Sequence, residues 1–346
     1  MAIGDAIGAR VEFMHYTYKS DEVKDMGKGI AGKFNLQPGQ WTDDSSMELC
    51  LADSLIEKDG NFEPKDIMMR FLLWWFQGYN NAFRLDKNRK NKHSVGLGGN
   101  ISGSLYDYLN EKGKNAYTVY GDRNTSGSGS IMRNASISIL YFKDEKKALE
   151  YAKKQSLITH LGDEAAGCCQ LLTYIIIKIL NMKRTNNKNE NSKKTNIDSN
   201  INQQNLKEIL ENITKDFKCD YKSVNCLARS EKERKDKNWD WKKEERHKYS
   251  ETRAQKEPGN IGSYCMDCLA MALNILYTTK NFKEEILKAV NIRGDADSLG
   301  SVVGQIAGAF YGLKGIPGDW VKTINQWDDN EIALRGYILC HLAENL

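Results

Sequence analysis

Apolar residues recur at helical spacing along most of this chain, and this periodicity restricts the fold more than any other feature of the sequence. In residues 45–56, for example, apolar side chains fall at Met47, Leu49, Leu51, Leu55 and Ile56. Runs of this kind predict helices at residues 45–56, 67–76, 148–158, 164–180, 206–216, 264–277, 283–290, 299–311 and 331–343. Strand-like runs are few and short, and residues 137–142 are the best candidate. The sequence therefore predicts a mainly α-helical fold.

The 346 residues are enough for about two domains by length alone. Hydrophobic helices are nevertheless expected on both sides of residues 183–258, so we interpret this segment as an insertion in a single domain of residues 1–346. Residues 183–205 are poor in apolar side chains and rich in Asn and Lys. Burial cannot offset the ordering entropy of such a segment, which is therefore expected to be disordered.

The net charge of +4 is unevenly distributed, because residues 181–258 hold 20 Lys and Arg against 14 Asp and Glu. Residues 228–258 also contain Trp239, Trp241 and Tyr249 among the charges. Such a segment is either a nucleic-acid-binding surface or a peripheral helix that packs its aromatic side chains. Acidic residues alternate with the basic ones and would weaken attraction to phosphate, so the peripheral helix is favoured.

No stretch approaches the roughly 18 uncharged apolar residues that a membrane-spanning helix needs. The first residues, Met1-Ala2-Ile3-Gly4-Asp5, lack the basic region and the long apolar run of a signal peptide. We therefore expect a soluble protein of the cytoplasm, or of the nucleus in a eukaryotic cell, with no membrane partner.

The 8 cysteines are sparse for a chain of this length. The close pairs are Cys168-Cys169 and Cys265-x-x-Cys268, and both lie in segments expected to be helical. No second pair with the spacing of metal ligands accompanies Cys268, so buried reduced thiols are expected at all four positions.

Two acidic clusters stand at the starts of expected helices. Thr42-Asp43-Asp44 alone is explained by a Thr N-cap and by carboxylates that favour the helix dipole. In Asp295-Ala296-Asp297-Ser298, however, the two Asp side chains would point to one side of an extended segment, with a hydroxyl beside them. Two such loops would together form an all-oxygen cage for Mg²⁺, Mn²⁺ or Ca²⁺.

The helix after the second cluster has glycine at every fourth position, at Gly300, Gly304, Gly308 and Gly312. Each interior glycine costs up to about 1 kcal/mol relative to alanine, so the stripe indicates very close approach of another helix. This packing would bring the two acidic loops together, although it also has a purely structural explanation.

Two glycine-rich stretches offer backbone N–H groups to a ligand. Residues 127–130, Gly-Ser-Gly-Ser, would suit a diphosphate, and residues 96–100, Gly-Leu-Gly-Gly-Asn, a ribose or phosphate. Neither matches a P-loop or a dinucleotide fingerprint, and each alone is more typical of a flexible turn.

Taken together and in order, these stretches resemble the ADP-ribosylglycohydrolase family, which includes ADP-ribosylarginine and ADP-ribosylserine hydrolases. The resemblance covers nearly the whole chain except residues 183–258. It rests on residues 4–13, Trp41-Thr42-Asp43-Asp44-Ser45-Ser46-Met47, Ser126-Gly127-Ser128-Gly129-Ser130-Ile131-Met132-Arg133, Thr159-His160, Arg293-Gly294-Asp295-Ala296-Asp297-Ser298 and residues 304–312.

The resemblance implies an all-α, orthogonally packed helical bundle with two Mg²⁺ or Mn²⁺ ions at its centre. Its metal-ligand positions fall on Thr42, Asp43, Asp44, Asp295, Asp297 and Ser298. Glu12 falls on the acidic residue beside the metals and is the expected acid/base, so that Glu12, Asp43, Asp44 and Asp297 are the expected catalytic residues. The ADP-ribose-binding positions fall on Gly99, Asn100, Gly127, Ser128, Gly129, Ser130 and His160.

The chain departs from the family pattern at several positions. Ser298 stands where Thr is usual, Ser128 where Asn is usual, and Arg293 where a small or apolar residue is usual. Family members usually begin several residues before Gly4, so a short N-terminal helix is expected.

The resemblance implies a metal-dependent hydrolase that removes ADP-ribose from arginine or serine of a modified protein, or from another acceptor. An ADP-ribosylated protein or an ADP-ribose-containing small molecule is the expected partner of a monomeric enzyme. Nucleic acid is expected as a partner only where it carries ADP-ribose. The alternative is a catalytically inactive, ADP-ribose-binding or structural member of the family.

Overall fold

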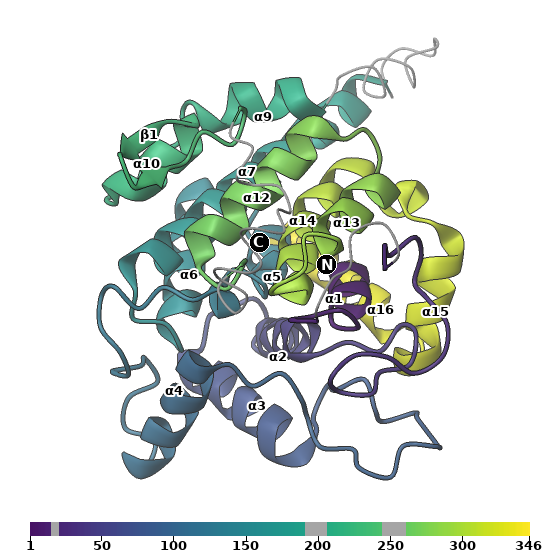
Figure 1. Ribbon diagram of the computed structural model, residues 1–346. Coiled ribbons are helices and arrows are strands. Elements are labelled where there is room, and N and C mark those ends of the chain that lie inside the picture. The colour runs from purple at the N-terminus through teal and green to yellow at the C-terminus, as the bar shows by residue number, and fades with distance from the viewer. Residues whose placement is uncertain (15–20, 191–205, 244–260) are drawn as a thin grey trace.

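The computed structural model describes residues 1–14, 21–190, 206–243 and 261–346 (Figure 1). These residues form an all-α bundle whose helices cross at large angles, with one two-stranded hairpin at its edge. The helices are α1 (Ala2–Gly8), α2 (Asp43–Glu57), α3 (Pro64–Gln77), α4 (Gly99–Asn110), α5 (Ala135–Leu140), α6 (Glu145–Leu157), α7 (Asp163–Glu190), α9 (Leu206–Thr214), α10 (Lys222–Arg229), α12 (Cys265–Thr278), α13 (Phe282–Val290), α14 (Ala296–Tyr311), α15 (Gly318–Asp328) and α16 (Glu331–Asn345). The hairpin pairs β1 (Lys232–Arg234) with β2 (Lys237–Asn238), and short 3₁₀ turns lie at Ser128–Ser130 and Leu313–Gly315.

The prediction of a mainly α-helical fold is confirmed, and each segment predicted to be helical coincides with a helix to within a few residues at the ends, α7 excepted. The prediction of a strand at residues 137–142 is wrong. This segment forms α5, and its buried Ile137, Leu140 and Tyr141 have the spacing of one helical face. Its alternating Ile and Ser residues imitate a strand, but Ser136 and Ser138 are buried as well as Ile137, so the alternation does not separate a buried from an exposed face.

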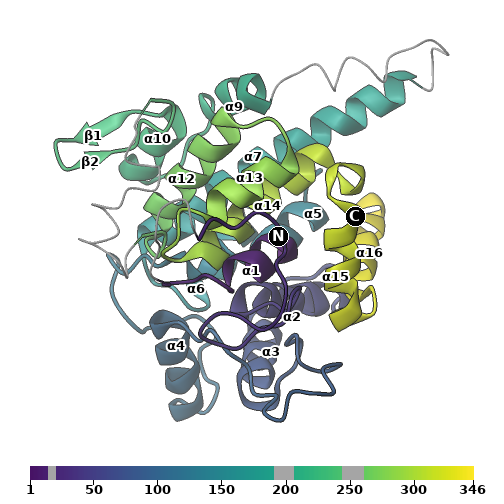
Figure 2. The ribbon, with the colours of Figure 1, turned by 45° about the vertical axis from the view of Figure 1, so that its right-hand side comes forward.

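Helix α14 lies in the middle of the bundle, with α1 beside it in all views (Figures 1 and 2). The two helices touch at bare glycines: a Cβ atom added to Gly300 would lie 2.5 Å from the carbonyl oxygen of Gly4. One turn away, a Cβ atom on Gly8 would lie 2.3 Å from the carbonyl oxygen of Ala296. Gly300 therefore does allow the close helix contact that the stripe predicted, and this contact places the start of α14 beside α1, whereas nothing lies within 4 Å of a Cβ atom at Gly308 or Gly312.

Because this contact admits no methyl group, Gly300→Ala is expected to lower the free energy of unfolding by about 2–3 kcal/mol, the usual cost of overpacking. Gly308 belongs to the same stripe, but nothing lies within 4 Å of a Cβ atom added there. Gly308→Ala is the matched control and should raise stability by about 0.5–1 kcal/mol through helix propensity alone. Urea unfolding of the two variants measures both effects, and equal stabilities would contradict the assigned contact.

Helix α7 is longer than predicted, since it continues through Glu190 and projects from the body of the bundle (Figure 2). Residues 183–190 of the segment predicted to be disordered are therefore helical, and residues 191–205 lie outside the described residues. Residues 163–185 are also long and apolar enough to cross a membrane by length and composition, which the sequence analysis did not anticipate. Because 72% of the apolar window is buried in the bundle, its composition is accounted for by packing.

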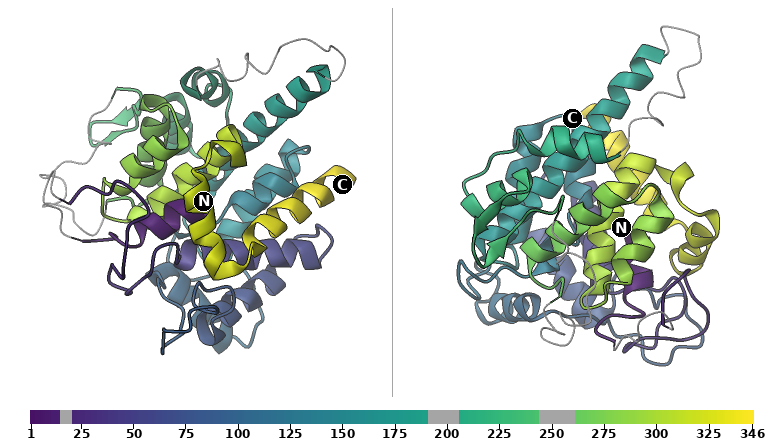
Figure 3. Two further views of the ribbon diagram at one scale, coloured as in Figure 1. Left: turned by 90° about the vertical axis from the view of Figure 1, so that its right-hand side faces the viewer. Right: turned by 45° about the horizontal axis from the view of Figure 1, so that its top comes forward.

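The described part of the charged segment contains α9, α10 and the hairpin, which lie together at the periphery (Figure 3). Trp239 and Trp241 are buried, and the Trp241 ring donates to the backbone carbonyl of Leu227 at 2.8 Å. These aromatic rings therefore pack against the bundle, as the sequence analysis expected. They belong to the residues just after β2, however, and not to a peripheral helix. Tyr249 lies outside the described residues.

The cysteines that lie close together in the sequence, Cys168, Cys169, Cys265 and Cys268, are buried free thiols, as predicted. Burial, more than any neighbour, raises the pKa of Cys168 and Cys268 well above the usual value for a thiol. These side chains therefore serve as core residues of α7 and α12.

A buried carboxyl in α13 is expected to make the stability of this protein depend on pH. Burial raises the pKa of Glu285 from 4.5 to about 8, and its Oε1 accepts a hydrogen bond from Tyr311 at 2.8 Å. Stability that is present below pH 4.5 should therefore be lost as the pH rises to about 8, because the unfolded chain ionises first.

Glu285→Gln cannot ionise and should be more stable than the wild type above pH 8, by about 1–3 kcal/mol, with little difference near pH 4. Thermal unfolding between pH 4 and 9 measures the difference. The neighbour Glu284 provides a comparison: its charge adds to the raised pKa of Glu285, but burial is the larger cause, so Glu284→Gln should leave most of the pH dependence in place. If the unfolding temperature of Glu285→Gln changed with pH in the same way as that of the wild type, the expectation would be contradicted.

Candidate active site

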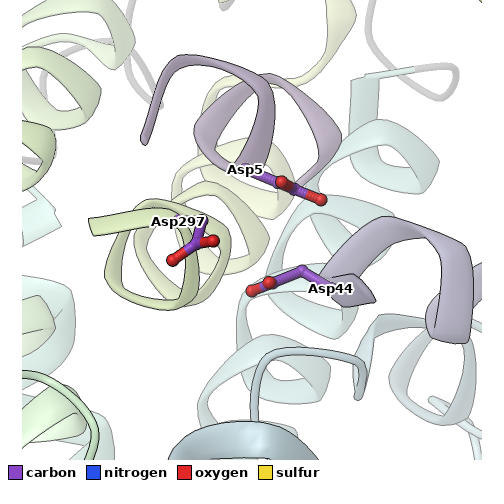
Figure 4. A group of neighbouring side chains, drawn as sticks. All are labelled: Asp5, Asp44 and Asp297. Carbon is purple, nitrogen blue, oxygen red and sulfur yellow. The ribbon is translucent and has the colours of Figure 1, made fainter. Parts of the chain in front are cut away.

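The two acidic loops meet at the starts of α2 and α14. In the sequence they are far apart, since Asp295 comes 252 residues after Asp43. Asp44 and Asp297 share a cluster with Asp5, in which one carboxylate oxygen from each lies within 4.8 Å of the others. Asp295 and Asp297 form a second such cluster with Glu12. Figure 4 shows Asp5, Asp44 and Asp297 projecting into the same space from α1, α2 and α14. Asp297 thus belongs to two adjacent groups of oxygen donors.

Asp5 is a member of this centre to which the sequence analysis assigned no role. Its Oδ1 accepts from the Thr42 backbone N–H at 3.0 Å and from the Thr42 hydroxyl at 2.8 Å, and its Oδ2 accepts from the Ser45 hydroxyl at 2.6 Å. Since both oxygens are occupied, Asp5 holds the first turn of α2 in place. The sequence did contain one sign of this role: Asp5 is a lone acidic residue among apolar neighbours. All residues of α1 are buried, and a buried carboxylate needs partners.

Glu12 follows α1 and reaches the second cluster. The backbone N–H of Phe13 donates to the carbonyl of Gly294 at 2.8 Å, which ties this turn to the loop before α14. Glu12 Oε1 pairs with the Lys33 ammonium at 2.9 Å, whereas Oε2 is buried without a hydrogen-bond partner in the described part of the chain. Burial, partly opposed by Lys33, raises the pKa of Glu12 to about 7.

The acidic groups destabilise one another in the metal-free protein. Burial and then the charges of Glu12 and neighbouring aspartates raise the pKa of Asp43 and Asp297 well above the usual value. The pKa of Asp44 is also raised well above its usual value, first by burial and then by Asp5, and its Oδ1 is buried without a partner among the described residues. Such an arrangement of hard oxygen donors is suited to a bound divalent cation.

The acidic side chains other than Asp5 line a cavity of about 310 Å³. Most of the predicted site residues contribute to its wall, namely Glu12, Asp43, Asp44, Gly99, Asn100, Gly127, Ser128, Gly129, His160, Asp295, Asp297 and Ser298. Thr42 lies just behind the wall, with its hydroxyl 3.3 Å from Asp297 Oδ2. Ser130 is fully buried and accepts from the Ser156 hydroxyl at 2.8 Å, so its side chain supports the loop from behind.

Two further contacts connect the glycine-rich loops to the acidic centre. The Ser128 hydroxyl donates to Asp295 Oδ2 at 2.9 Å, so the residue in the usual Asn position reaches an acidic residue. Gly96 has φ of +91°, and a Cβ atom there would lie 2.0 Å from Asp43 Oδ1. Gly96 is therefore required for close approach to Asp43, a role that its place in a glycine-rich run did not specify.

The comparisons with known proteins agree with this geometry. The family model described as ADP-ribosylglycohydrolase matches residues 1–345. The chain is 30% identical over 328 residues to the ADP-ribosylarginine hydrolase Tri1 of Serratia proteamaculans, covering 94% of this chain and 73% of that protein. It is 24% identical over 344 residues to the ADP-ribosyl-[dinitrogen reductase] glycohydrolase of Rhodospirillum rubrum, covering 99% and 94%.

A solved structure, titled ADP-ribosylglycohydrolase-related protein complex, is similar in fold. It has a TM-score of 0.69 and 25% sequence identity, and the match covers 99% of this chain and 94% of that one. The helical bundle, the ordered motifs and the family match over nearly every residue lead to one conclusion: the chain belongs to the ADP-ribosylglycohydrolase family, and it is a hydrolase.

Proposed function

We propose that this hydrolase removes ADP-ribose from arginine side chains of modified proteins and needs divalent cations to do so. The observation that carries the proposal is the meeting, at the wall of one cavity, of carboxylates from the turn after α1 and from the starts of α2 and α14. The name of the Serratia relative supports the arginine linkage.

The donor set fits a pair of hard cations such as Mg²⁺ or Mn²⁺. Its side chains offer only oxygen, and buried oxygens of Asp44 and Glu12 have no partner among the described residues. The buried guanidinium of Arg133 donates to Gln155 and Thr159. The residues that would hold the ions are Thr42, Asp43, Asp44, Asp295, Asp297 and Ser298.

A bound pair of divalent cations supplies positive charge near the ribose and lowers the pKa of a water molecule. The remaining tasks belong to the chain itself. Glu12 lines the cavity, and its Oε2, which has no hydrogen-bond partner among the described residues, would take a proton from the attacking water and pass it to the departing guanidine nitrogen. Gly127 and Gly129 leave the loop backbone open for the diphosphate, which fixes the ribose against the carboxylates.

The test is release of ADP-ribose from arginine-linked, serine-linked and DNA-linked substrates, each with Mg²⁺, with Mn²⁺ and with a chelator. We expect the fastest release from the arginine-linked substrate and none with the chelator. Release from serine alone would refute the arginine assignment, and release in the chelator would refute the metal requirement. Binding of ADP-ribose without release from any substrate would support an inactive member of the family, an alternative that the family relatives do not favour.

A further inference from the structure

Arg133 is a buried cation that forms no ion pair with a carboxylate in the described ranges. Its side chain is fully buried, and its guanidinium lies 4.6 Å from the centre of the Phe71 ring. It donates to Gln155 Oε1 at 3.3 Å and, in its shortest hydrogen bond, to the Thr159 hydroxyl oxygen at 2.6 Å. Because a guanidinium can only donate, the Thr159 oxygen must act as the acceptor in this contact.

The Thr159 hydroxyl has one other partner among the described residues, His160 Nδ1 at 2.8 Å. If Nδ1 carried the ring proton, the Thr159 oxygen would accept twice and its own proton would have no acceptor. A buried hydroxyl proton without an acceptor is costly. The arrangement that satisfies every group therefore has Thr159 donating to an unprotonated Nδ1, and the neutral His160 ring then carries its proton on Nε2.

The Nε2 edge of His160 faces the glycine-rich loop. A Cβ atom added to Gly127 or Gly129 would lie 3.4 Å or 3.1 Å from Nε2, so the two glycines leave this edge uncovered. His160, Gly127 and Gly129 all line the cavity. In the part of the chain that the structure describes, Nε2 has no hydrogen-bond partner.

We infer that Arg133 and Thr159 are positioning residues: they form a hydrogen-bond relay that fixes His160 as the Nε2–H tautomer and presents this N–H to an oxygen of the bound diphosphate. The ligand half of the inference rests on the proposed function. Burial and the Arg133 charge keep the ring neutral, since together they lower the pKa of His160 to about 3. Arg133 thus acts through His160 without itself lining the cavity.

The ring proton can be located directly by NMR in the ligand-free protein. Histidine labelled with ¹⁵N gives different nitrogen shifts for the two neutral tautomers and for the imidazolium, and the His160 signals are those lost in His160→Gln. At neutral pH we expect a protonated Nε2 and an unprotonated Nδ1. A protonated Nδ1, alone or in an imidazolium, would overturn the relay.

Affinity for free ADP-ribose in the presence of Mg²⁺ tests the consequence for binding. Thr159→Val keeps the shape but removes the hydroxyl, and should weaken binding about tenfold, as expected when one hydrogen bond to a charged oxygen is no longer fixed. Thr159→Ser restores the hydroxyl and should bind within about twofold of the wild type. Thr173 is another fully buried threonine with hydrogen-bonded hydroxyl, so Thr173→Val is the matched control.

Equal affinities for Thr159→Val and Thr173→Val would overturn the role of the relay in binding. Unfolding temperatures of both variants show whether a loss of affinity merely follows a loss of stability. Failure of the wild type to bind ADP-ribose at all would overturn the proposed function. The NMR measurement of ring protonation at His160 would then be the test of the relay.

Discussion

Without divalent cations, Asp297→Asn is expected to unfold at a higher temperature than the wild type, and with them the order should reverse. Burial and the surrounding carboxylates raise the pKa of Asp297 well above its usual value, so its ionised form is unfavourable in the metal-free fold. Asparagine removes this charge and can still accept from the Ser298 backbone N–H, as Asp297 Oδ1 does at 3.0 Å. We expect a gain of about 1–3 kcal/mol in the metal-free state.

The reversal follows from binding. Asp297 belongs to both clusters, so its replacement should weaken both cation sites. At a cation concentration about 100 times the dissociation constant, each occupied site adds about 2.7 kcal/mol to the stability of the wild type, whereas the variant gains little. Loss of the charge that the cations supply to the transition state should lower kcat/KM by about 10³-fold or more.

Differential scanning fluorimetry with a chelator and with Mn²⁺, together with calorimetric titration of Mn²⁺, gives both measurements. Asp319 in the first turn of α15 is almost fully exposed, so Asp319→Asn controls for the loss of a negative charge alone. It should show no reversal. Undiminished uptake of two Mn²⁺ ions by Asp297→Asn would contradict the assignment of Asp297 to both sites.

Apolar spacing was sufficient for nine of the described helices, because their signals are local, but α4, α10 and α15 were not predicted. Apolar spacing located α2, α12 and α14 to within a few residues. The same locality explains the error at residues 137–142, where alternation of Ile and Ser resembles a strand over six residues. Burial of Ile137, Leu140 and Tyr141 on one helical face is decided by the neighbouring helices, and these are distant in the sequence.

The acidic residues were also recognisable, but their convergence was not. No spacing rule connects Asp44 with Asp297, since their meeting depends on how α1, α2 and α14 pack. The glycine stripe was the one local sign of this packing, and Gly300 does touch Gly4. The stripe could not identify α1 as the partner helix, and for that reason Asp5 received no role.

Buried polar networks are the part of the site that the sequence analysis missed. Arg133, Gln155 and Thr159 come from separate stretches of the chain, and each alone is an ordinary polar residue. Their hydrogen bonds form only because burial excludes water, which leaves each donor dependent on one or two protein acceptors. Resemblance to the family identified His160, whereas the groups that orient its ring required coordinates.

Glu12→Gln is expected to lower kcat by 10²- to 10⁴-fold, the usual contribution of a general acid or base, while ADP-ribose affinity stays within about threefold. The amide keeps the size of the side chain but cannot take a proton at Oε2. In free energy, the loss corresponds to about 3–5 kcal/mol of the activation barrier. Single-turnover release from an arginine-linked substrate gives the rate, and calorimetry with ADP-ribose gives the affinity.

Lys33 decides between proton transfer and a merely structural role for Glu12. The substitution Glu12→Gln also weakens the pair with the Lys33 ammonium, whose side chain is 42% exposed. A pair this exposed contributes about 1 kcal/mol or less, so Lys33→Met, which removes the pair but leaves the carboxylate, should lower kcat less than about tenfold. If Lys33→Met reproduced the full loss, the ion pair would account for the effect. If instead Glu12→Gln retained full activity, the proton would have to move through another group, and Asp295, which shares the second cluster with Glu12, would be the next candidate.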